Sequence, residues 1–163
     1  MTAPSPSSAA PAVVKPEVGV GSVILRVAAG RVEVLLIQRG RPPGEGRWNI
    51  PGGRQEPGET VRETAVREVL EETAVQIVNL RLIDVVDIVT RRHDSTVESH
   101  WTLIDFRADW AGGNAVAGSD AADVRWVAMD DLDSYGLWDE TLRVIRAGAA
   151  MSSPAGPGED MRS

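Results

Sequence analysis

Runs of Val, Ile and Leu predict several β-strands in this chain. Two of them, at 18–27 and 32–40, are separated by the turn sequence Ala-Ala-Gly-Arg and predict a hairpin. Three further strands are predicted at 80–90, 99–110 and 124–129, where β-branched and aromatic residues alternate with polar ones. The segments that separate these strands contain the glycines and prolines that are typical of loops.

Helical spacing of apolar residues occurs in two places. The first is 60–73, where Thr60 and Glu63 match the capping box that begins many helices. Its apolar positions are Val61, Ala65, Val66, Val69 and Leu70. The second is 137–149, near the end of the chain. Because apolar residues occupy much of the circumference of the first helix, we expect it to be buried on more than one side.

Strands that come in hairpins, with helices inserted singly, are typical of a mixed sheet held between helices. The sequence therefore predicts an α/β (α+β) sandwich. We expect one domain at 17–150, because 163 residues suffice for a single hydrophobic core. The segments 1–16 and 151–163 are rich in Pro, Ser, Ala and Gly, and we expect a disordered leader and a disordered tail there.

Composition and charge exclude several classes of protein. No apolar run approaches the ~20 residues that cross a bilayer. The first residues also lack the pattern of a secretory signal, which is a basic start followed by an apolar stretch. We therefore expect a cytoplasmic location and no membrane partner. The lack of Cys excludes disulfides, thiolate nucleophiles and Cys-bound zinc. A net charge of −7 argues against nonspecific binding of nucleic acid, so an anionic ligand requires a mediating cation.

Three glutamates gather on one face of the first predicted helix. At about 100° per residue, Glu68, Glu71 and Glu72 fall within one arc of the helix surface. Like charges at this spacing repel each other. Oxygen ligands so arranged are suited to Mg²⁺, with Mn²⁺ as an alternative. Taken alone, the cluster is also compatible with a solvated acidic face that binds nothing.

The residues around this cluster extend the pattern. Gly53 and Glu59 precede the run Arg67-Glu68-Val69-Leu70-Glu71-Glu72, which is followed by Ala74 and Val75. This arrangement resembles the Nudix box, the signature of hydrolases that act on a nucleoside diphosphate linked to another moiety. The preceding sequence Gly-Arg-Trp-Asn-Ile-Pro-Gly is similar to the family's lead-in. The resemblance implies a Nudix-type α/β/α sandwich, and it extends more loosely over 18–149.

The resemblance also implies roles for individual residues. Its metal ligands would be Glu68 and Glu72, with the carbonyl of Gly53 and, as a further ligand, Glu71. Glu71 is the alternative general base, since the residue that activates water differs between branches of the family. Arg67 and Glu59 would complete the catalytic set by bracing the loop against the helix; the alternative for this pair is a surface ion pair.

Substrate contacts are expected beside the box. Gly52 and Gly53 lack a Cβ and allow phosphates to approach the backbone closely. Arg39 and Arg41 are candidates for phosphate contacts, or else they only solvate a loop. The family resemblance favours a packing role for Trp48 over base stacking.

Four further positions have two alternative interpretations each. Glu98, His100 and Asp120 are candidates for an additional ligand or base, and each is alternatively a structural or solvent-facing residue. Ala74 stands where the family normally has glycine at the end of the helix. Either the helix ends differently here, or alanine adopts a left-handed conformation at a cost of about 1 kcal/mol.

The resemblance implies an enzyme, a Mg²⁺-dependent pyrophosphohydrolase with a nucleotide-type substrate. Similarity to bacterial ADP-ribose pyrophosphatases favours hydrolysis of ADP-ribose to AMP and ribose 5-phosphate. The first alternative is a nucleoside triphosphate pyrophosphohydrolase that removes oxidised or noncanonical nucleotides. The second is a noncatalytic Nudix module that senses a ligand or binds a protein. Related enzymes are often homodimers, so a homodimer is also an expectation.

Overall fold

The computed structural model describes residues 14–118 and 120–151. The predicted leader and tail therefore lie almost entirely outside the described residues. The elements in chain order are β1 (Glu17–Ala28), β2 (Arg31–Arg39), β3 (Trp48–Asn49), β4 (Gly52–Arg54), α1 (Val61–Thr73), β5 (Gln76–Arg91), β6 (Val97–Gly112), β7 (Ala121–Ala128), the 3-10 helix η1 (Met129–Tyr135) and α2 (Asp139–Ala150).

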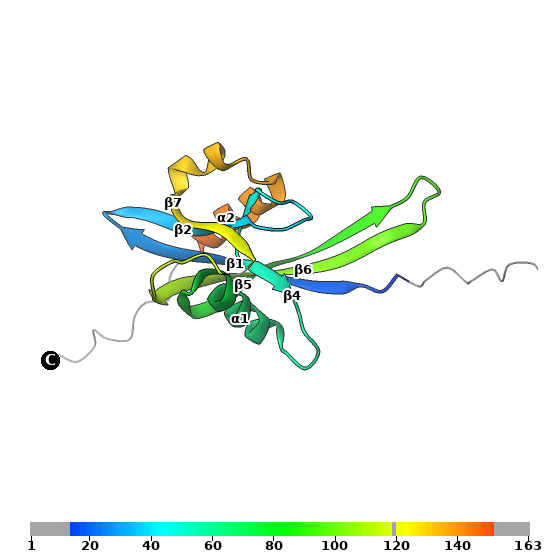
Figure 1. Cartoon of the computed structure of the whole chain (residues 1–163), viewed down its shortest axis with the longest axis horizontal. Coiled ribbons are helices and arrows are strands. Elements are labelled where there is room, and N and C mark those ends of the chain that lie inside the picture. Colours follow the sequence, from blue (N-terminus) through cyan, green and yellow to red (C-terminus); the bar gives the residue numbers. More distant parts are fainter. Residues whose placement is uncertain (1–13, 119, 152–163) are drawn as a thin grey trace, which may run out of the picture.

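The strands form one mixed sheet of seven strands. Its main path has the order β3-β2-β1-β6-β5, with β4 paired to β1 and β7 paired to β2. The central pair, β1 and β6, is parallel, and the other pairs are antiparallel. Helix α1 lies on one side of this sheet and α2 on the other (Figure 1). The predicted α/β sandwich with a mixed sheet is confirmed.

The predicted strands are present, and β5 and β6 exceed their expected lengths most. The hairpin of β1 and β2 turns between Ala28 and Arg31 as predicted. Strands β5 and β6 extend past the end of the sheet as a two-stranded arm (Figure 1), because the pairing of β1 with β6 begins only at Trp101. The short strands β3 and β4 were missed, since two or three residues are too few to show a periodicity, and the seven-residue 3-10 helix η1 was also missed.

Helix α1 begins as the sequence predicts but packs differently. The Thr60 hydroxyl accepts a hydrogen bond from the Glu63 N–H, and the Glu63 carboxylate accepts one from the Thr60 N–H, which completes the capping box. The expected burial on more than one side is wrong, because Val66 and Leu70 are 48% and 52% exposed. The buried residues are Thr64, Ala65, Val69 and Thr73. These four residues lie on one half of the helix surface, and Val66 and Leu70 lie on the other half.

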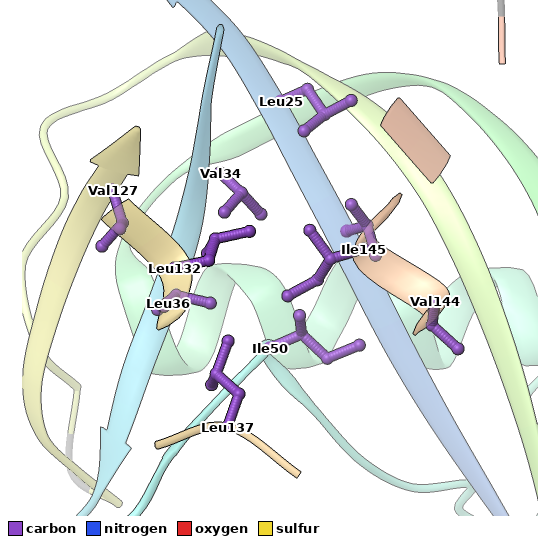
Figure 2. Packing of buried hydrophobic residues seen from close by; sticks show 10 residues of the cluster. Leu25, Val34, Leu36, Ile50, Val127, Leu132, Leu137, Val144 and Ile145 are labelled. Carbon is purple, nitrogen blue, oxygen red and sulfur yellow. The ribbon is translucent and has the colours of Figure 1, made fainter. Parts of the chain in front are cut away.

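The core is divided between the two sides of the sheet by the alternation of side chains along each strand. Toward α2, the cluster includes Val23 and Leu25 of β1. Figure 2 shows part of it, with Val34 and Leu36 of β2 near Ile145 of α2. Toward α1, the cluster consists of Ile24, Leu35, Val69 and Val75. Neither helix in the described part of the chain has the length and apolarity needed to cross a membrane.

Ala74 ends α1 in the left-handed conformation, with φ 56° and ψ 17°, and its N–H donates to the Leu70 carbonyl at 3.0 Å. The chain therefore keeps the helix end usual for glycine and accepts the strain. We expect Ala74→Gly to raise the free energy of unfolding by about 0.5–1 kcal/mol, because glycine adopts this conformation without a Cβ penalty. Urea denaturation measures the change. The control Ala147→Gly, within α2, should lower stability by a similar amount, and a loss of stability in Ala74→Gly would contradict the prediction.

Candidate active site

The last two turns of α1 pack against the two glycines that begin β4. The Gly52 N–H donates a hydrogen bond of 2.8 Å to Glu72 Oε2. The Glu68 carboxylate lies directly against Gly53, since a Cβ at position 53 would overlap its oxygens. Strand β4 is held in place by antiparallel pairing with β1. The sheet and the helix thus bring two carboxylates, Glu68 and Glu72, onto the Gly52–Gly53 backbone.

Burial makes the negative charge of these carboxylates unfavourable. Desolvation raises the pKa of Glu72 to about 7, and the charges of Glu68 and Asp120 add to this effect. The Gly52 N–H and the Arg39 charge act in the opposite direction. Desolvation also raises the pKa of Glu68, although Arg67 opposes it. The site therefore has a surplus of desolvated negative charge that a bound cation would relieve.

Arg67 connects the loop before α1 to the helix itself. Its Nε and Nη2 donate to the two oxygens of Glu59 at 2.6 and 3.0 Å, and its Nη1 donates to Glu68 Oε1 at 2.8 Å. Nη2 also donates to the Arg54 carbonyl at 3.2 Å. The Arg67 and Glu59 side chains are only 23% and 19% exposed. This bidentate contact is the brace that the sequence predicts rather than an open surface pair.

The Arg67 brace makes stability depend on pH. Hydrogen bonding by Arg67 is the main cause that lowers the pKa of Glu59 from 4.5 to about 2. A carboxyl group whose pKa falls on folding stabilises the folded state above its unfolded pKa, and this contribution disappears as the pH falls through the folded value. We expect Glu59→Gln to be less stable than the wild type above pH 4.5, and the difference to shrink as the pH falls towards 2.

Urea denaturation midpoints between pH 3 and pH 7 would measure this difference. Glu45→Gln is a matched control, because Glu45 lies exposed in the loop between β2 and β3. Its stability should follow that of the wild type over the whole range. A difference between Glu59→Gln and the wild type that does not change with pH would contradict the assignment.

The three glutamates do not converge as the helical face predicts. The Glu71 side chain is 60% exposed and lies 3.3 Å from Arg67 Nη1, outside the pair formed by Glu68 and Glu72. Among the described residues, no three acidic or His side chains form a ready-made cation site. Arg67 Nη1 donates to both Glu68 Oε1 and Glu71 Oε2, whereas Glu72 Oε2 accepts from the Gly52 N–H. Two desolvated carboxylates beside glycine backbone still fit a divalent cation, which Glu68 and Glu72 would hold.

The two candidate phosphate-binding arginines lie in different places. Arg39 lines a cavity that is also lined by Gly52 and Gly53, and its positive charge lowers the pKa of Glu72. Arg41 instead forms an exposed ion pair of 2.9 Å with Asp120 and does not line that cavity. Arg39 is therefore located beside the cavity, and the phosphate contact expected of Arg41 stays a prediction. Trp48 packs edge-to-face on Tyr135, with ring centroids 5.2 Å apart, in agreement with a packing role.

The remaining candidates from the sequence are also separated. Glu98 and His100 lie on the arm of β5 and β6, where His100 Nε2 is 3.5 Å from Asp87. Neither residue lines the cavity next to Gly52 and Gly53. Asp120, the third candidate, lies closer to the site, since its negative charge contributes to the raised pKa of Glu72.

A cavity of about 450 Å³ opens beside the glycine pair, within the usual range for small-molecule sites. Gly52, Gly53 and Arg39 belong to its lining. Its other lining residues include Gly19, Gly21, Asn49, Trp101, Leu103, Asp105, Trp138, Glu140 and Thr141. Asp105 and Asn49 were not among the residues predicted from the sequence to form the site. The available signal was the alternation of 101, 103 and 105 along one strand, which places these side chains on one face.

These features define a class of protein: an α/β/α domain in which a glutamate-bearing helix packs on a Gly-Gly strand that also lines a cavity. The model of the NUDIX domain matches residues 15–147 of the chain. The chain therefore belongs to the Nudix hydrolase family, as the box predicts.

Several known proteins are similar to this chain. It is 35% identical over 102 residues to the uncharacterized Nudix hydrolase YvcI of Bacillus subtilis, 36% over 104 residues to a putative 8-oxo-dGTP diphosphatase of the same organism, and 35% over 110 residues to the ADP-ribose pyrophosphatase of Methanocaldococcus jannaschii. These matches cover 63%, 63% and 68% of the chain. They span 62%, 62% and 63% of the relatives' own lengths.

Two solved structures share the fold. The NUDIX domain of Shewanella oneidensis NrtR, in complex with ADP ribose, has a TM-score of 0.73 and 22% identity, and the match covers 88% of this chain and 93% of that one. A MutT NUDIX hydrolase from Burkholderia pseudomallei has a TM-score of 0.67 and 29% identity over 82% of this chain and 98% of that one. The observed sheet and helices are therefore those of the family.

Proposed function

We propose that the chain hydrolyses the pyrophosphate bond of a nucleoside diphosphate linked to another moiety, with Mg²⁺ or Mn²⁺ as cofactor. The best candidate is ADP-ribose, which gives AMP and ribose 5-phosphate. One observation carries the proposal: Glu68 and Glu72 are desolvated against the Gly52–Gly53 backbone, and these two glycines also line a cavity of about 450 Å³. The two carboxylates would repel an anionic ligand unless a bound cation neutralised their negative charge.

The residues of the site have separate tasks in this reaction. A divalent cation held by Glu68 and Glu72 supplies charge neutralisation for the phosphates. Arg39 contacts a phosphate from the cavity wall, and the glycine backbone allows the close approach. The oxygen of water bonds to one phosphorus while the bond from that phosphorus to the bridging oxygen breaks. Glu71, the most accessible of the three carboxylates, accepts the proton of the water.

The relatives support two substrates. The similarity to the ADP-ribose pyrophosphatase of M. jannaschii supports ADP-ribose. The similarity to a putative 8-oxo-dGTP diphosphatase of B. subtilis, at nearly the same identity, supports a nucleoside triphosphate as the second candidate. Both substrates would use the same cavity and the same carboxylates. Identifying the reaction products therefore distinguishes between the two proposals.

A screen with Mg²⁺ and with identified products tests the proposal. Dinucleotides, sugar nucleotides and nucleoside triphosphates are each offered to the protein. AMP and ribose 5-phosphate from ADP-ribose are the expected products, whereas a monophosphate and pyrophosphate would establish the triphosphate reaction. No turnover of any compound with either Mg²⁺ or Mn²⁺ would contradict the hydrolase and favour a noncatalytic module.

A further inference from the structure

Strand β5 is an edge strand along its whole length. Among the described residues it pairs only with β6. Its sequence contains neither Lys nor Pro, two residues with which proteins commonly protect such an edge. Four of its apolar side chains are between 41% and 49% exposed: Val78, Leu82, Val85 and Val89. A long edge with exposed apolar side chains is a surface to which another strand can be added.

The arm formed by β5 and β6 lacks a third strand. Residues 97–100 of β6 lie before its pairing with β1 begins at Trp101, so the arm consists of two strands only (Figure 1). An isolated two-stranded hairpin is at best marginally stable in water, and a third strand stabilises it. The β6 edge of the arm is interrupted at Glu98, which has no partner in β5, whereas every residue of β5 from 84 to 91 has a partner in β6. The continuous edge of β5 is therefore the one suited to a further strand.

The charges on this edge are self-complementary. Asp87, Val89 and Arg91 are alternate residues of β5 and therefore share one face of the arm. Two β5 strands that run antiparallel across a two-fold axis at Val89 place Val89 opposite itself and Asp87 opposite Arg91 on both sides of the axis. Unlike charges directly opposite each other stabilise a sheet, and like charges destabilise it. The charge pattern thus fits a second copy of the same strand.

Both charged groups are accessible in the single copy. The Asp87 side chain is 64% exposed; it accepts a hydrogen bond of 2.7 Å from the Thr102 hydroxyl and lies 3.5 Å from His100 Nε2. Within the described chain, the Arg91 guanidinium contacts only the Ser95 carbonyl, at 3.1 Å. Since a guanidinium carries several N–H donors, Arg91 retains donors for a carboxylate of another molecule.

We propose that the arm is an interaction surface for a second copy of this chain, in which the two β5 strands pair antiparallel across a two-fold axis at Val89. The pairing joins two arms into one four-stranded sheet and gives the expected homodimer a defined interface. Only about five residues of each strand pair, so the association is weaker than that of an obligate dimer and depends on concentration. The inference goes beyond the proposed function and does not rest on it.

Sedimentation velocity of the full chain tests the interface. We expect a species of twice the 17.5 kDa of one chain to increase as the protein concentration rises to about 200 µM. Asp87→Arg and Arg91→Asp should each weaken the association at least about tenfold, because each places like charges opposite each other twice. The double variant Asp87→Arg/Arg91→Asp should restore it. Arg92→Asp, with the same change of net charge as Arg91→Asp but on the other face of the arm, is the control and should associate like the wild type.

Cysteine cross-linking tests the register independently. The chain contains no Cys, so Val89→Cys introduces a single thiol that lies opposite its own copy at the axis. Residues directly opposite each other in antiparallel strands have Cα atoms about 4.5–5.5 Å apart, which is within the range of a disulfide. Oxidation should therefore convert Val89→Cys into a covalent dimer. Val85→Cys, at a position of similar exposure, is the control and should remain monomeric on a non-reducing gel.

Several results would overturn the inference. One is a monomer over the whole concentration range, and another is an association that neither charge reversal weakens. A third is cross-linking of Val85→Cys as fast as that of Val89→Cys. Restored association in the double variant would show that the single reversals act through opposed charges rather than by unfolding the arm, and a double variant that stays monomeric would also overturn the inference.

Discussion

Glu72→Gln is expected to reduce turnover about a thousandfold, which corresponds to about 4 kcal/mol of transition-state stabilisation. The substitution keeps the size of the side chain, and its amide oxygen still accepts from the Gly52 N–H. It removes the charge that would hold a cation beside Glu68. Steady-state kinetics on the substrate identified by the screen would measure the loss.

The fold should survive this change. Burial disfavours the ionised form of Glu72, whose pKa is raised to about 7, so the glutamine variant should be at least as stable as the wild type at pH 8 without added metal. Glu98→Gln, on the exposed arm, is the matched control and should retain full activity. Near-normal turnover in Glu72→Gln would remove the proposed cation site.

Gly53→Ala is expected to lower kcat/KM about a hundredfold, because a displacement of about 1 Å at a catalytic group has effects of this size. A Cβ at position 53 would overlap the Glu68 carboxylate, which is the flexible end of a side chain and is able to move aside. The protein should therefore stay folded while Glu68 leaves its position. Kinetics and thermal denaturation of the same sample separate the two effects.

Gly52→Ala provides the contrast. Here the added Cβ would overlap the Val20 carbonyl oxygen, which belongs to the paired backbone of β1 and cannot move aside. We expect a loss of stability of about 3 kcal/mol or more, the upper range for overpacking.

A double variant tests the contact between Gly53 and Glu68 directly. Shortening the Glu68 side chain in Gly53→Ala/Glu68→Asp should recover part of the activity lost in Gly53→Ala. Equal activity of Gly53→Ala and the wild type would contradict the close contact of Glu68 with the backbone.

The sequence predicted the features that depend on neighbours along the chain. The capping box of Thr60 and Glu63 was recognisable because its two hydrogen bonds join residues only three positions apart. The hairpin of β1 and β2 follows from two apolar runs and a short turn. The left-handed conformation of Ala74 was one of two expected outcomes at that helix end. In each case the local chain contains all the interacting groups.

At other positions the surroundings of a side chain differ from what the spacing along the chain suggests. Helical periodicity groups Glu71 with Glu68 and Glu72, but the Glu71 side chain is exposed and contacts Arg67 of the preceding turn. Arg41 forms an exposed ion pair with Asp120, which the sequence did not connect with it, and its phosphate contact stays a prediction. Val66 and Leu70 have the spacing of buried residues, yet the sheet reaches only one side of α1.

The sequence by itself determined the family, the mixed sheet between helices and the carboxylates on which the proposed chemistry depends, because spacing within the box is a property of the chain. Only the tertiary structure decided which residues from other segments lie beside the box. Pairing of β1 with β4 and β6 brings Gly52, Gly53 and Asp105 into the lining of the same cavity. No local pattern contains these contacts, since they join residues far apart in the chain through sheet register and helix packing.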